Sequence, residues 1–103
     1  MIVESTHYWA RAGQLEAVLA QRRRATALRL RLGLAPGRMH RRREGDGPDV
    51  RWECEFPSED EYRRDLAVRA ASPEFAATRQ AMHALLERFE RHVEESVEDL
   101  SPR

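Results

Sequence analysis

The sequence contains no lysine, no asparagine, only one cysteine and no net charge. All 18 of its Lys or Arg positions are arginine, and 18 acidic residues balance them. A balanced charge lacks the basic footprint of most nucleic-acid-binding proteins, so we expect no nucleic-acid partner. Because one cysteine cannot form an internal disulfide, the composition fits a reducing compartment.

The chain also lacks the apolar run of roughly 20 residues that a membrane-spanning helix needs. Its first residues, Met1 to Glu4, have neither the basic nor the apolar segment of a signal peptide. We therefore expect a cytoplasmic protein with no membrane partner. At 103 residues the chain has room for one domain with a modest core, so residues 1–103 are expected to form a single domain.

Three segments have the alternation and the β-branched or aromatic content of strands. These are residues 2–9, 38–44 and 49–56, and a Gly-Asp-Gly-Pro turn between the last two predicts a hairpin. In the third segment Val50, Trp52, Cys54 and Phe56 share one face, and Arg51, Glu53 and Glu55 share the other. If Glu44 pairs with Asp49, His40 lies opposite Glu53 and Arg38 opposite Glu55; this register is a hypothesis.

Two long segments have helical periodicity. Residues 14–32 predict a helix that Gly33 ends, although Leu28 to Leu32 also alternate as a strand would. A capping box at Ser58 opens a second helical segment, which restarts at Ser72-Pro73. The strongest apolar stripe of the chain follows and is assigned to this helix: Phe75, Met82, Leu85, Leu86 and Phe89. Residues 92–100 fit either a final strand or a continued helix.

The order strand-helix-strand-strand-helix-strand predicts an α+β, ferredoxin-like βαββαβ fold. Right-handed crossovers place both helical segments on one face of a four-stranded antiparallel sheet. Nothing in the chain remains to cover the other face. We therefore predict a homodimer in which two sheets stack about a two-fold axis, with charged residues paired inside the interface.

The segment Val50 to Pro57 (VRWECEFP), the acidic helix start and the segment Ala71 to Phe75 (ASPEF) resemble the dimeric α/β-barrel superfamily. The nearest branches are small NIPSNAP-like and antibiotic-biosynthesis-monooxygenase-like proteins. The resemblance spans nearly the whole chain and concerns its layout, since no catalytic signature matches. It implies a two-subunit β-barrel with a pocket in each subunit between sheet and helices. In that superfamily the pocket takes small aromatic or quinone-like molecules, lactones or haem.

Five residues are candidates for such a pocket. His7 and Trp9 share a face of the first strand, Trp52 lies on the neighbouring third strand, and His83 lies near the apolar stripe of the last helix. If these faces meet, they form a Trp-lined cavity in which His7 or His83 acts as a general base. Tyr62 is the fifth candidate for ligand binding. The same tryptophans fit a plain core, and the same histidines fit the surface.

Other chemistries find little support. The histidines at 7, 40, 83 and 92 never fall at i, i+3 or i, i+4, so we predict no metal site. The haem-degrading members of the superfamily use an Asn-Trp-His set, and this chain has no Asn, so we expect no cofactor. Cys54 lies mid-strand on an apolar face, where a thiol is normally inert. Two functions remain open: a cofactor-independent oxygenase or isomerase on a small aromatic or cyclic compound, or a non-catalytic small-molecule-binding or structural dimer. Haem binding through one axial His is a third, weaker option.

Overall fold

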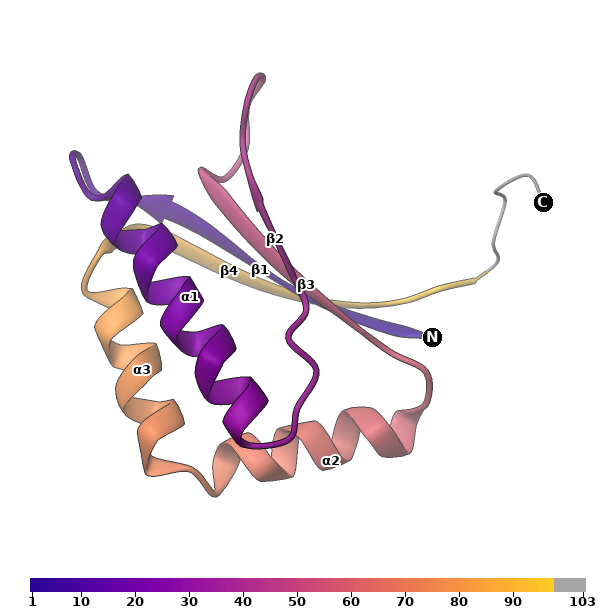
Figure 1. Cartoon of the computed structure of the whole chain (residues 1–103). Helices are drawn as coiled ribbons and strands as arrows, with labels where there is room; N and C mark the ends of the chain where they lie inside the picture. Colours follow the sequence, from indigo (N-terminus) through magenta and orange to yellow (C-terminus); the bar gives the residue numbers. More distant parts are fainter. Residues whose placement is uncertain (98–103) are drawn as a thin grey trace.

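Seven helices and strands follow one another along the chain in the computed structural model, which describes residues 1–97 (Figure 1). They are β1 (Ile2–Ala10), α1 (Leu15–Arg31), β2 (Arg38–Arg41), β3 (Val50–Phe56), α2 (Glu59–Ala70), α3 (Pro73–His83) and β4 (Leu86–Glu95). The strands form one antiparallel sheet in the order β2-β3-β1-β4. This confirms the predicted α+β, ferredoxin-like fold.

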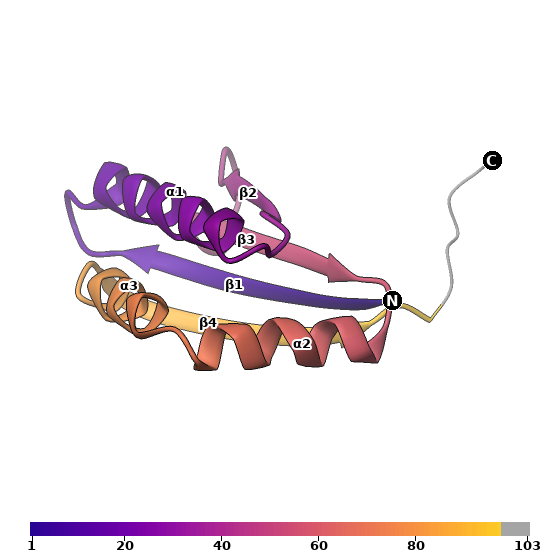
Figure 2. The same ribbon diagram turned by 60° about the horizontal axis from the view of Figure 1, so that its bottom comes forward.

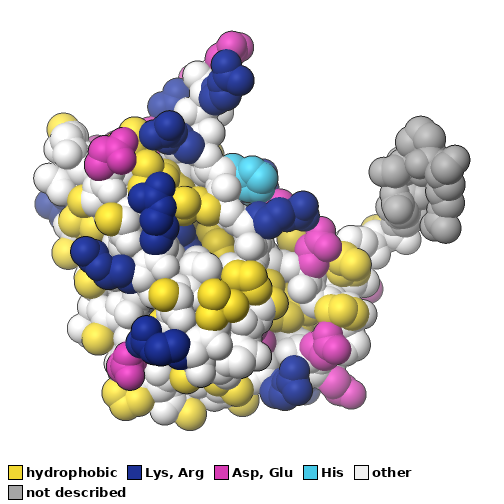
Figure 3. Space-filling view, viewed as in Figure 1, with side chains coloured by type: hydrophobic (Ala, Val, Ile, Leu, Met, Phe, Trp, Pro, Cys, Tyr) yellow, Lys and Arg dark blue, Asp and Glu magenta, His cyan; other side chains and the backbone are white. Residues whose placement is uncertain are grey.

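All three helices lie on the same side of the sheet (Figures 1 and 2). Helices α1 and α3 lie side by side, and α2 continues toward the end of the sheet where β1 begins. None of the helices in residues 1–97 is long and apolar enough to cross a bilayer. On the side of the helices, Arg side chains are interspersed with acidic and apolar ones (Figure 3).

The core lies between the helices and the inner face of the sheet. Strand β3 contributes Val50, Trp52, Cys54 and Phe56, which are all buried as their alternation predicted. Helix α1 contributes Val18, Leu19, Ala25 and Leu28. The segment Leu28 to Leu32, which also fitted a strand, comprises the last turn of this helix and its C-cap residue Leu32. Gly33 follows with a φ of +76°.

Local capping explains where α2 and α3 begin. The Ser58 hydroxyl accepts a hydrogen bond from the Glu61 N–H at 3.2 Å, and the Ser72 hydroxyl accepts one from the Phe75 N–H at 3.1 Å. Each bond satisfies an N–H that has no partner within the helix. Both predicted helix starts are confirmed.

The predicted end of the last helix is wrong. Helix α3 stops at His83, and β4 begins at Leu86, so Leu85, Leu86 and Phe89 are not helical. The register of β4 against β1 shifts between Trp9 and Ala10, which leaves Glu87 as an extra residue in β4. Leu86 and Phe89 therefore reach the same face of the sheet although they are three residues apart, a spacing that imitates a helix.

The remaining part of this strand resolves most of the ambiguity at the C-terminus. Residues 92–95 belong to β4, which pairs with β1 as far as Ile2 opposite Glu95. Residues 98–100, the end of the ambiguous segment, lie outside the described residues.

The predicted hairpin register is also wrong. Strand β2 ends at Arg41, and Arg38 lies opposite Glu53 while His40 lies opposite Arg51, two residues from the hypothesis. A shift of two residues keeps every side chain on its face. Arg38 consequently still reaches Glu55 at 3.2 Å, and His40 reaches Glu53 at 3.4 Å, on the uncovered face.

Candidate functional site

A cavity of about 110 Å³ lies between the inner face of the sheet and the helices. Its size is on the order of the cavities that bind benzene, so it has room for one small ring. Its wall is partly apolar, with Ala25, Trp52, Phe75, Met82 and Phe89. The rest of the wall is polar or charged and comprises Glu4, Thr6, Tyr8, Gln21, Arg22, Arg29, Arg69, Thr78, Arg79, His83 and Arg91.

Strand β1 presents an unusually polar face to this cavity. Glu4, Thr6 and Tyr8 alternate along the strand, and all three are buried. The Thr6 hydroxyl donates to the Tyr8 hydroxyl at 2.6 Å. A buried polar side chain needs hydrogen-bond partners, and these three residues find theirs inside the cavity.

The buried acids of the wall are already paired. Glu4 is fully buried, and it accepts from Arg69 Nη1 at 3.1 Å and from Arg91 Nε at 2.8 Å. Burial raises the pKa of Glu4, but the charges and hydrogen bonds of Arg69 and Arg91 outweigh it and leave the pKa below its ordinary value. Asp65, next to the cavity, pairs with Arg29 Nη2 at 2.6 Å and with Arg69 Nε at 3.0 Å.

Arg22 on α1 is buried without such an acid. The residue is only 7% exposed, and its Nη1 donates to the Tyr8 hydroxyl at 3.3 Å. Among residues 1–97, Nε and Nη2 have no hydrogen-bond partner. The guanidinium stacks on the Trp52 ring at 4.4 Å from its centroid. Burial lowers the pKa of Arg22, as expected for a cation without a counter-ion.

His83 lies at the end of α3 and also lines the cavity. Its ring meets the edge of the Phe89 ring at 4.6 Å between centroids. His83 is an exposed residue, so its imidazole joins the cavity to the solvent. A proton taken up by this ring would therefore exchange with water.

Of the five predicted pocket residues, the structure brings together Trp52 and His83 in the cavity wall. The expected convergence of His7 and Trp9 with Trp52 is wrong. Thr6 lies opposite Trp52 in the sheet, so His7 and Trp9, one residue out of phase, point away from the helices. Tyr62 lies beside the cavity, where it packs on Phe56 at 5.2 Å and accepts from Arg91 at 2.8 Å.

The sequence contained a signal for Arg22 that its residue type concealed. Arg22 falls in the apolar stripe of residues 14–32, between Leu19 and Ala25. A charged residue in such a stripe points to a buried charge, and a buried charge needs a partner. Glu4 gave a weaker signal, because a short strand permits either of its faces to be the inner one.

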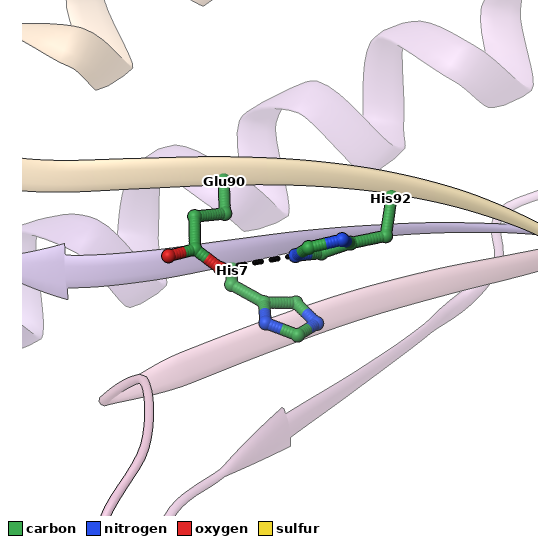
Figure 4. Close-up of side chains that lie close together, drawn as sticks. All are labelled: His7, Glu90 and His92. Atoms are coloured by element: carbon green, nitrogen blue, oxygen red, sulfur yellow. Dashed lines mark hydrogen bonds and ion pairs between the residues drawn. The ribbon is translucent and has the colours of Figure 1, made fainter.

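A second group of side chains lies on the uncovered face of the sheet. His7 on β1 meets His92 on β4 at 4.8 Å between ring centroids, and His92 Nε2 lies 3.0 Å from Glu90 Oε1 (Figure 4). Burial lowers the pKa of His7, and the nearby His92 and Arg51 lower it further. The two histidines are 85 residues apart in the sequence, so their local spacing gives no sign of this pair.

Cys54 is not a candidate nucleophile. It is buried on the inner face of β3, and burial raises the pKa of its thiol. A thiol with a raised pKa is a weak nucleophile.

The fold and the internal cavity define a ferredoxin-like protein with a pocket between its sheet and its helices. A comparison of the sequence with models of protein families finds no match, and a comparison with curated proteins finds none either. Solved structures do match along nearly the whole chain, and they include NIPSNAP proteins and antibiotic biosynthesis monooxygenases.

Three solved structures represent these matches. A NIPSNAP domain protein from Burkholderia xenovorans has a TM-score of 0.71 at 16% identity, over 100% of both chains. SnoaB, a cofactor-independent oxygenase from Streptomyces nogalater, has a TM-score of 0.65 at 22% identity, over 98% of this chain and 97% of its own. A dimeric protein of unknown function from Bacteroides fragilis has a TM-score of 0.68 at 16% identity, over 92% and 95%. The ferredoxin-like fold of the single chain that the resemblance implied is confirmed.

Proposed function

We propose that this protein binds a small aromatic anion in the cavity between the sheet and the helices. The observation that carries the proposal is Arg22, a buried cation with two unpaired donors that lines the cavity. A buried charge without a partner is costly, and an anionic ligand would supply the missing partner.

The two unpaired donors favour a carboxylate or a similar two-oxygen group. Nε and Nη2 form one edge of the guanidinium, and this edge binds two oxygens in parallel hydrogen bonds. The Tyr8 hydroxyl accepts from both Thr6 and Arg22, so its own proton remains for a ligand oxygen. These three donors belong to two hydrogen-bonded residues of the cavity wall, Tyr8 and Arg22.

The remainder of the wall favours an aromatic ring. Trp52, Phe75 and Phe89 offer ring faces or edges, and Met82 adds a polarisable sulfur. A cavity of about 110 Å³ suits one ring with its acidic group and is far too small for a tetrapyrrole such as haem.

Isothermal titration calorimetry with benzoate, salicylate and the neutral isostere benzamide tests this binding. We expect the acids to bind and benzamide to bind at least about tenfold more weakly, because a hydrogen bond to a charged group contributes roughly 1.5–3 kcal/mol. Arg22→Met should remove the preference, whereas Arg23→Met, at its exposed neighbour on α1, should keep it. Equal binding of acid and amide by the unaltered protein would contradict the proposal.

A catalytic role is the second candidate, and His83 favours it. Its imidazole lines the same cavity as Arg22 and reaches solvent. It would take a proton from an acidic C–H or O–H of the ligand, and Arg22 would stabilise the oxyanion that forms. Both an isomerase and a cofactor-independent oxygenase, the activity of the structural neighbour SnoaB, can begin with this step.

Oxygen uptake and ligand isomerisation, screened with single-ring phenols and enols, separate catalysis from binding alone. If the protein is an enzyme, His83→Gln should slow turnover by roughly 10²–10⁴ while ligand binding persists. His40→Gln, which alters a histidine on the other face of the sheet, is the matched control. If no phenol or enol that binds is converted, the protein is a binding module.

A homodimer is the third part of the proposal. The helices leave the outer face of the sheet uncovered, and the structural neighbour from Bacteroides fragilis is described as dimeric. Each outward residue of β3 is charged, and Arg51 pairs with Glu53 at 3.1 Å. Such a face suits a second copy of itself if the two-fold axis places the acidic residues of one copy against the arginines of the other.

A further inference from the structure

We propose that His7, Glu90 and His92 form a binding site for a divalent transition-metal ion of the zinc class on the outer face of the sheet (Figure 4). Each residue offers one ligand atom, and the three atoms lie within 4.8 Å of one another. These three residues do not line the cavity, which lies on the opposite face of the sheet. The proposal is therefore independent of the ligand-binding cavity, although the site lies on the sheet face proposed for the dimer.

The ligand set matches the chemistry of these ions. Two imidazoles and one carboxylate bind zinc, cobalt and nickel, and three protein ligands leave a position open for water or a substrate. Ligands of a tetrahedral zinc ion lie roughly 3.3 Å apart, given zinc–ligand bonds of about 2.0–2.1 Å. His92 Nε2 and Glu90 Oε1 are already 3.0 Å apart, and a rotation of the half-buried His7 ring would complete the set.

The backbone holds the three residues in place. In the antiparallel ladder His7 lies opposite Glu90, and Ser5, on the same face, lies opposite His92. Side chains directly opposite each other have Cβ atoms about 4.5–5.5 Å apart, which suits ligands of one ion. The site therefore needs no loop to close around the metal.

The surrounding side chains support the ligands. Arg88 pairs with Glu90 through Oε2, which leaves Oε1 toward the two histidines. Such an outer partner orients the carboxylate that binds the metal. Arg51, the other nearby cation, is neutralised by Glu53 at 3.1 Å. The Ser5 hydroxyl, 3.4 Å from His7 Nε2, offers a polar neighbour below the ring.

Titration of the untagged protein with Zn²⁺ by calorimetry tests the site. We expect one ion per chain, and a loss of affinity of at least about tenfold to a hundredfold in both His92→Gln and Glu90→Gln. That range is the cost of removing an outer partner of a metal ligand, and removing a ligand itself costs no less. Both residues lie on the sheet surface away from the core, so circular dichroism and thermal unfolding should show folded variants.

Quenching of tryptophan fluorescence by Co²⁺ locates the bound ion. The Trp9 ring centroid is 6.3 Å from that of His7, whereas Trp52 lies on the inner face. Co²⁺ should therefore quench the fluorescence of Trp9, and Trp9→Phe should lose the quenching while the affinity stays the same.

His40→Gln is the matched control, since His40 lies on the same face but outside the ligand set. The proposal is overturned if His40→Gln weakens binding as much as His92→Gln does. It is equally overturned if the unaltered protein binds no Zn²⁺ at about 100 μM, or if Co²⁺ leaves Trp9 unquenched.

Discussion

Arg22 and Glu4 are both buried charges, and they differ in what partners them. Glu4 has two arginines within hydrogen-bond distance, whereas Arg22 has a tyrosine hydroxyl and an indole ring. Removing one partner of a paired buried charge destabilises the fold, whereas a buried charge that has no partner is destabilising as it stands. At the scale of the residue, this contrast separates a structural group from a candidate ligand-binding group.

The stability of the protein should depend on the ionisation of Glu4. Its pKa in the folded state lies below the ordinary 4.5, so its ion pairs contribute fully above that pH and are lost as the pH falls through the lower folded value. The Glu4→Gln variant should therefore lack the loss of stability that protonation of Glu4 causes at acidic pH. At neutral pH the variant should be less stable by about 3–5 kcal/mol, toward the lower end because Arg69 keeps Asp65.

Urea unfolding of both proteins between about pH 3 and pH 7 measures this difference. Glu59→Gln is the control, because Glu59 pairs with Arg63 on the exposed surface and such pairs contribute about 0–1 kcal/mol. Parallel curves for the unaltered protein and Glu4→Gln would show that Glu4 is not ionised in the core.

At the scale of the element, Gly37 joins α1 to the sheet. It has a φ of +70°, and a Cβ there would lie 2.5 Å from Trp52 Nε1 and 2.6 Å from the Glu53 carbonyl oxygen. The same indole N–H donates to the Pro36 carbonyl at 2.9 Å. Close approach of the backbone to Trp52 therefore requires glycine at this position.

Gly37→Ala should lower the free energy of unfolding by more than Gly45→Ala does. Gly45 has a φ of +80° with no atom within 4 Å of its would-be Cβ, so its substitution brings backbone strain alone, about 1 kcal/mol. Thermal or urea unfolding of the two variants measures the difference. Equal losses would mean that the contact with Trp52 relaxes without cost.

The sequence predicted the elements better than it predicted their faces and ends. The caps at Ser58 and Ser72 and the alternation of β3 are local, and each was confirmed. The end of α3 was missed because Leu86 and Phe89 satisfy a helical spacing only through a bulge in their pairing with β1. Sequence periodicity cannot distinguish these cases, since the bulge depends on the partner strand.

The candidate site was predicted in part for the same reason. Trp52 and His83 were placed in the cavity wall, whereas His7 and Trp9 were assigned to the wrong face of β1. Both faces of β1 carry polar and aromatic side chains, so hydropathy could not choose between them. The inner face holds Glu4, which burial alone would disfavour, and its arginine partners come from α2 and β4.

At the scale of the whole molecule, the outer face of the sheet should form the dimer interface. Sedimentation at micromolar concentration should give a dimer, and salt should weaken it because charged pairs contribute to the contact. Trp9→Glu, which places a charge beside Arg88 and Glu90, should shift the equilibrium toward monomer. Leu30→Glu, at an exposed position on α1, should leave the dimer intact. A monomer under all conditions would contradict this interface.

We propose that Arg22 is kept, at some cost in stability, for an anionic ligand. The most direct test of this proposal is the thermal and urea unfolding of the unaltered protein and of Arg22→Met, each with and without benzoate. Without benzoate we predict that Arg22→Met is at least as stable as the unaltered protein, by up to about 3 kcal/mol, because it buries no unpaired charge. Benzoate at about 100 times its dissociation constant should stabilise the unaltered protein by about 2.7 kcal/mol and leave Arg22→Met unchanged. An Arg22→Met protein that is destabilised without ligand, yet is stabilised by benzoate as much as the unaltered protein, would contradict the account.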